Sequence, residues 1–136
     1  MNRAAFQRLS HLRVREARAL LRARCYAGAY YLLGYAVECA LKACIAKQVK
    51  RHDFPPKDGS KFYTHKPVEL LRLAGLKESL ESDIPHSPLL ADSWATVKDW
   101  SEEVRYDASV SKAMAHDMLV ACTRPDGILG WLRERW

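Results

Sequence analysis

The chain has 136 residues, about half of them apolar and 28% charged, which is the size and composition of one globular domain with a core of its own. Its longest uncharged run is 13 residues, short of the roughly 20 that cross a bilayer, and its first residues lack the apolar part of a secretory signal. We therefore expect a single cytoplasmic domain over residues 1–136, with no membrane span. The net charge of +6 lies entirely in residues 1–24, which hold seven arginines and one acid, Glu16.

The cysteines and histidines show no metal-binding pattern. No two of the four cysteines form a C-x-x-C pair, and the five histidines are scattered along the chain. Zinc sites and redox motifs need close spacings of this kind. We expect buried, reduced thiols, no metal and no cofactor.

The first predicted helix, Arg3–Arg24, carries the excess charge. Phe6, Leu9, Leu12, Ala17, Leu20 and Ala23 recur at helical spacing and predict its buried face. Opposite them lies a line of basic residues, called the basic stripe from here on: Arg8, His11, Arg15, Arg18 and Arg22. Such a stripe can bind phosphate oxygens or an acidic partner, or it can be a solvated helix face. It has no aromatic residue for base stacking.

The second predicted helix, Tyr26–Val49, is apolar almost all the way round, so we expect other helices to surround it. Glu38 and Lys42 interrupt it four residues apart, the spacing of an ion pair on one helix side. We interpret them as a structural polar pair, and a functional pair in a cleft is the alternative. Tyr31 and Tyr35 share that side and suggest a polar seam.

The remaining chain predicts shorter helices. Proline and glycine residues in Arg51–Tyr63 indicate a loop. Gly75 is predicted to end one helix, and Ser87-Pro88 is a typical start of another. We expect helices at Pro67–Leu73, Ser87 to about Arg105–Asp107, Ser109–Cys122 and Ile128–Trp136, with a further turn at Lys77–Ser82. No segment alternates at period two. The predicted fold is an all-α, up-and-down bundle of four to five main helices plus a short C-terminal helix.

Two acid–base candidates remain open. Asp117 is predicted to lie within the apolar face of the last long helix, where a carboxylate needs a cationic partner such as Arg105. With His116 it could form an acid–base site, although a structural pair is the simpler interpretation. His65 could be catalytic, or it could act in capping before the short helix.

Three segments together resemble the HEPN family of small, all-helical prokaryotic proteins. The segment GYAVECALKA contains the pattern A-x-E-x-x-L-K-A at Ala36–Ala43. THKPVELL at Thr64–Leu71 resembles the family's T-H segment, and Arg105-Tyr106 resembles its R-Y step before the last helix. The resemblance implies a helical bundle that often dimerises.

The resemblance also implies two kinds of function. Many HEPN proteins are metal-independent ribonucleases whose motif is an Arg, then four to six intervening residues, then a His. Others bind RNA or partner proteins, often beside a nucleotidyltransferase in toxin–antitoxin or defence systems. Here the residues at that spacing after Arg105 are Val110, Ser111 and Lys112, and the next histidine is His116.

Three hypotheses follow. The first is an HEPN-like binding module without the ribonuclease motif, engaging RNA or a cognate nucleotidyltransferase. The second is a diverged endoribonuclease using Arg105 with His116 or Asp107, and the third is a structural dimerisation module. We expect a homodimer, because Trp94, Trp100, Leu119, Trp131 and Trp136 are a surplus of large apolar groups.

Overall fold

A computed structural model describes residues 1–49 and 63–136, and within them every regular element is a helix. The elements are α1 (Arg3–Arg22), α2 (Tyr26–Gln48), α3 (Pro67–Leu73), α4 (Lys77–Asp83), α5 (Pro88–Val97), α6 (Lys112–Thr123) and α7 (Ile128–Arg133), with 3-10 turns η2 (Ile84–His86) and η3 (Glu102–Tyr106). The all-α prediction is confirmed. Apart from Tyr63, the predicted loop Arg51–Tyr63 lies outside the described residues.

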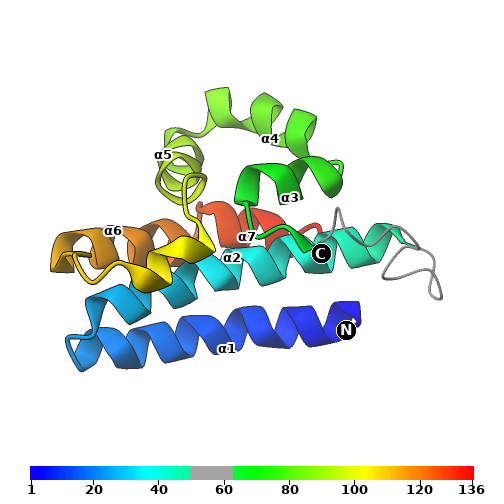
Figure 1. Ribbon diagram of the computed structural model, residues 1–136. Coiled ribbons are helices and arrows are strands. Elements are labelled where there is room, and N and C mark those ends of the chain that lie inside the picture. The colour runs from blue at the N-terminus through cyan, green and yellow to red at the C-terminus, as the bar shows by residue number, and fades with distance from the viewer. Residues whose placement is uncertain (50–62) are drawn as a thin grey trace.

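The arrangement is built around α2. α1 and α2 form a long antiparallel hairpin, and the shorter helices cover the remaining sides of α2 (Figure 1). Figure 1 views α5 nearly along its axis while α2 lies across the picture, so these two helices cross steeply. The up-and-down arrangement therefore describes the α1–α2 hairpin better than it describes the shorter helices.

α2 is the central helix, as its sequence predicts. Twelve of its residues are buried, including Leu33, Val37 and Leu41, which form the core with α3, α5, α6 and α7. Its length and hydropathy would suit a membrane-crossing helix, but 67% of its most apolar window is buried inside the molecule. A helix apolar on all sides is thus accounted for by its neighbours in the bundle.

α1 ends two residues before the predicted Arg24. Arg24 adopts a left-handed conformation, with φ of 61°, and the amide of Cys25 donates to the carbonyl of Leu20 at 2.8 Å. A left-handed residue followed by such a backbone hydrogen bond is a common C-terminal cap of helices, although glycine most often takes the left-handed position. Gly75, with φ of 70°, closes α3 in the same way and as predicted.

The helix predicted to run from Ser87 to about Arg105–Asp107 is wrong in its second half. α5 ends at Val97, and the buried ring of Trp100 then lies flat against Gly34 of α2. A continuous helix would carry Trp100 along the axis of α5 and away from this contact. The chain resumes as η3, which holds Arg105 and Tyr106 beside α2.

Candidate functional site

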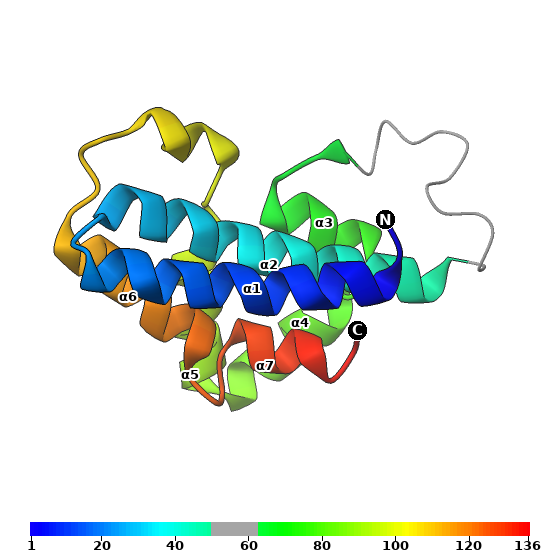
Figure 2. The ribbon, with the colours of Figure 1, turned by 90° about the horizontal axis from the view of Figure 1, so that it is seen from below.

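The outer face of α1 displays the basic stripe. α1 packs along α2 with Phe6, Ser10, Val14 and Ala17 buried, and the Ser10 hydroxyl donates to the carbonyl of Ala36 at 2.8 Å. The predicted apolar face is therefore partly wrong, because Leu12 and Ala23 are exposed. The polar Ser10 can face α2 because that hydrogen bond satisfies it. All five stripe residues are exposed. Figure 2 shows α1, which carries them, in the foreground.

The arginines of the stripe have no acidic partner among the described residues. The ion pair on α1 joins Arg13 to Glu16 at 2.7 Å and leaves out Arg8, Arg15, Arg18 and Arg22. A shallow groove beside them is lined by Leu12, Arg15, Glu16, Arg18, Ala19 and Arg22. Four guanidinium groups thus face solvent together, next to a small apolar strip.

His11 differs from the other stripe residues. Its ring meets that of Trp136 edge to face, with centroids 5.4 Å apart, and Arg133 lies over the same tryptophan. Partial burial and the charge of Arg133 lower the pKa of His11. His11 therefore packs as a neutral ring at neutral pH, and the charge of the stripe comes from its arginines.

A second group of polar residues surrounds Glu38 and is called the polar cluster here. Glu38 is buried, and its Oε1 accepts hydrogen bonds from Lys42 Nζ and His65 Nδ1, each at 2.7 Å. The predicted Glu38–Lys42 pair is thus present. Its link to His65, 27 residues further on, could not be seen in the sequence. The cluster comprises Tyr31, Tyr35, Glu38, Lys42, His65 and Arg105.

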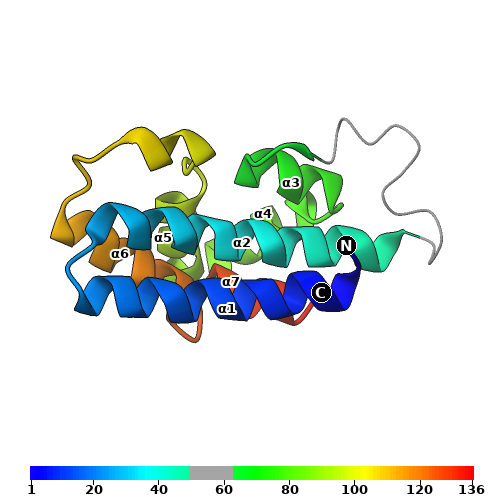
Figure 3. The same cartoon turned by 60° about the horizontal axis from the view of Figure 1, so that its bottom comes forward.

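Tyrosines connect Glu38 to Arg105 across the surface of α2. The ring of Tyr35 lies 4.9 Å from Tyr31 and 6.0 Å from His65, centroid to centroid. Burial, a hydrogen bond with Tyr31 and the charge of Glu38 raise the pKa of Tyr35. Hydrogen bonding to Tyr31 raises the pKa of Arg105, whose guanidinium lies over Tyr106. Figure 3 shows the two segments that bring His65 and Arg105 to α2, just before α3 and at η3.

Two buried polar atoms near this cluster lack hydrogen-bond partners within the described residues. They are Glu38 Oε2 and Trp100 Nε1. The Trp100 ring packs against Tyr35, with centroids 5.3 Å apart, and against Gly34, so its indole N–H lies in a tightly packed contact. The bond between Glu38 and His65 ties the start of α3 to α2, and the hydrogen bond between Tyr31 and Arg105 ties η3 to α2.

The predicted acid–base pair on α6 does not form. α6 begins at Lys112, after the Ser111 side chain caps its first turn, and its buried face is Ala115, Met118, Ala121 and Cys122. Asp117 therefore lies outside the buried face of α6, contrary to its predicted place within the apolar face. Asp117 and His116 are exposed, and no interaction among the described residues joins either of them to Arg105.

Asp107 and Thr64 serve local structure. Asp107 accepts hydrogen bonds from the amide and hydroxyl of Ser109, and these lower its pKa. Thr64 accepts from the amide of Lys66. No side chain of the described residues caps α3, whose N-cap residue is Lys66, so the predicted capping role is wrong and His65 bonds Glu38 instead.

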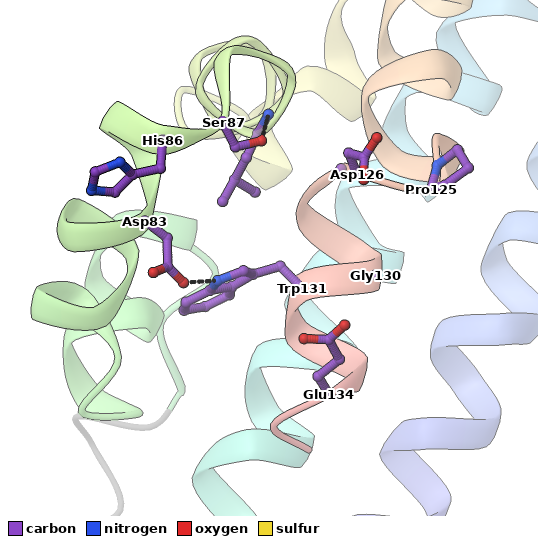
Figure 4. A pocket seen from close by; sticks show the side chains of 10 residues that line it. Asp83, His86, Ser87, Pro125, Asp126, Gly130, Trp131 and Glu134 are labelled. Atoms are coloured by element: carbon purple, nitrogen blue, oxygen red, sulfur yellow. Dashed lines mark hydrogen bonds between the residues drawn. The ribbon is translucent and has the colours of Figure 1, made fainter.

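A separate cavity lies between the start of α5 and α7, lined by residues that include Asp83, His86, Asp126, Trp131 and Glu134 (Figure 4). Asp83 already accepts from the indole of Trp131 at 2.8 Å and pairs with Arg135 at 3.3 Å. The described residues contain no group of three His, Cys, Asp or Glu side chains placed to hold a metal ion.

The chain matches no model of a known protein family, and it has no significant match among curated proteins or solved structures. The HEPN resemblance therefore rests on the three sequence segments alone. Two of them, around Glu38 and at His65, meet in the polar cluster, and the third supplies Arg105.

Proposed function

We propose that the protein is an HEPN-like, cytoplasmic binding module without ribonuclease activity, and that the outer face of α1 is its binding surface for an anionic macromolecule. In a toxin–antitoxin or defence-type system this macromolecule is RNA or a cognate nucleotidyltransferase. The single observation that carries the proposal is the set of four exposed arginines on one helix face without acidic partners in the described structure.

The electrostatics of the rest of the chain support this surface. Outside residues 1–24 the basic and acidic side chains balance, so the field of the molecule is centred on α1. A field of one sign over one face attracts polyanions and speeds their association. Glu16 lies in the groove beside these arginines, but its carboxylate pairs with Arg13 at 2.7 Å.

The endoribonuclease alternative has less support. It requires Arg105 and His116 to act on one phosphate, but Arg105 is engaged with Tyr31 and Tyr106 while His116 lies exposed on α6. We expect no cleavage when the protein is incubated with structured and unstructured RNA in chelator. Cleavage abolished by both Arg105→Ala and His116→Ala would establish the alternative.

Salt dependence tests the binding surface. Each phosphate contact to single-stranded RNA contributes a log–log slope of about −0.7, so four arginine contacts give roughly −3. Titrations should use RNA of about 20 nucleotides and, in parallel, an acidic polypeptide such as polyglutamate. The variant with Gln at positions 8, 15, 18 and 22 should keep its fold and lose the binding. Unchanged affinity and slope in that variant would refute the proposal.

A further inference from the structure

The outermost side of α1 holds two apolar residues beside the arginines. Ser10, Val14 and Ala17 point to α2, and the opposite side of the helix holds Leu12 and Ala19. Leu12 is 38% exposed, Ala19 is also exposed, and both line the groove described above. The arginines run along one side of these two residues, so the face combines an apolar strip with a basic strip.

Both strips repeat every seven residues. Leu12 and Ala19 are seven apart, as are His11 and Arg18, and Arg8, Arg15 and Arg22 continue the same spacing. Seven residues are two helical turns, so the three arginines stay in line for about 20 Å of the helix and Leu12 and Ala19 for about 10 Å. Helices that pack along each other use a repeat of this length, with two apolar positions in each heptad and charged flanking positions that select the partner. The outer side of α1 supplies one apolar position in each heptad, so the arginines would make the other contacts.

The face therefore fits a protein helix better than a nucleic-acid backbone. Phosphates would use the arginines but would gain nothing from Leu12 and Ala19. The groove also has no aromatic side chain on which a base could stack. An amphipathic helix would bury Leu12 against its own apolar line while its carboxylates meet the arginines, and guanidinium–carboxylate pairs are among the stronger charged contacts.

We propose that α1 docks an acidic amphipathic helix of a partner protein, with the partner's apolar line over Leu12 and Ala19 and its carboxylates against Arg8, Arg15 and Arg22. This inference rests on the proposed function and names the partner of the same surface. Because Leu12 and Ala19 are exposed, they can be replaced without opening the core.

The test uses a synthetic helical peptide of about three heptads, with Leu and Glu at the positions that would face the two strips. Control ligands are the same peptide with Lys in place of Glu and an unstructured RNA of about 20 nucleotides. The protein variants are Leu12→Gln, which removes the apolar contact, and Arg15→Gln with Arg22→Gln, which removes charge. Circular dichroism checks that each variant is folded.

We expect the acidic peptide to bind, the Lys peptide not to bind, and Leu12→Gln to weaken the acidic peptide about tenfold, which is about 1.4 kcal/mol. The double arginine variant should weaken it as well. Acidic-peptide binding that is unchanged in Leu12→Gln would overturn the inference, because charge alone would then explain it. RNA binding without peptide binding would overturn the inference and leave the proposed function standing. Failure of every anionic ligand to bind would overturn both.

Discussion

Gly34 is the position on α2 where the ring of Trp100 rests. A Cβ atom there would lie 1.9 Å from Trp100 Cε2, and the ring is held on its other sides by Tyr31 and Tyr35. Trp100 is almost completely buried, so it has no free space into which it can move. The glycine thus fixes where η3 and Arg105 meet α2.

Gly34→Ala should therefore destabilise the fold by about 1–3 kcal/mol or more through overpacking. Gly28→Ala on the same helix is the matched control. There the nearest atom is the flexible end of Leu20 at 3.2 Å, and the gain in helix propensity is about 0.5–1 kcal/mol. Urea denaturation of both variants checks the prediction, and an equal effect of the two substitutions would show that Trp100 does not pack there.

Glu38 offers a second test at the scale of one residue. Glu38→Ala leaves Lys42 largely buried without its carboxylate and frees His65, so we expect a loss of about 3–5 kcal/mol. Glu16→Ala breaks an exposed pair of the same 2.7 Å length and should cost no more than about 1 kcal/mol. Similar losses in the two variants would mean that Glu38 does not hold the start of α3 to α2.

Among the elements, α1 is coupled to the C-terminal residues through His11 and Trp136. Because the folded state lowers the pKa of His11 below its ordinary 6.5, the unfolded chain binds the proton more readily. Stability should consequently fall as the pH drops through about 6.5 and below. His11→Gln should show a smaller loss over that range. Thermal melts from pH 8 to about pH 5 measure it, and parallel profiles for both proteins would contradict the account.

How much of this could be predicted from the sequence depends on whether the signal is local. α3 and its closure at Gly75 follow from a proline, an apolar pair and a glycine within nine residues. The end of α5 at Val97 depends on Gly34, more than sixty residues earlier, and no local pattern marks it. The predicted position of Asp117 is wrong because α6 begins only at Lys112 and buries Ala115, Met118, Ala121 and Cys122. The bond between His65 and Glu38 joins residues 27 apart and is likewise non-local, although each residue could be singled out from the sequence on its own.

For the molecule as a whole, the reactivity of the four cysteines tests whether the core excludes solvent. Burial raises the pKa of Cys39 and Cys44 to about 11 and that of Cys122 to about 12, whereas Cys25 is exposed. Thiolates are the reactive form, so a thiol reagent at neutral pH should label Cys25 alone in the native protein. All four cysteines should react in denaturant. Mass spectrometry counts the labels, and rapid native labelling of Cys122 would show that the core opens.

The surplus of large apolar residues, from which we expected a homodimer, does not support one. Trp100 and Trp131 are buried, and Trp94, Leu119 and Trp136 are packed against the core. A homodimer stays a proposal from the HEPN resemblance. Light scattering at micromolar concentration should then give twice the 15.5 kDa of the chain, and a species of 15.5 kDa alone would exclude it.

The central claim is that the outer face of α1, rather than the polar cluster or α6, is the binding surface. Nuclear magnetic resonance of the nitrogen-15-labelled protein, titrated with the acidic three-heptad peptide, tests it directly. We predict that the shifted signals come from the amides of residues 8–22 and from the side-chain N–H groups of Arg8, Arg15, Arg18 and Arg22. Signals from Tyr35, His65 and Arg105 should stay in place. Shifts centred on those three residues or on His116, with α1 unaffected, would contradict the account.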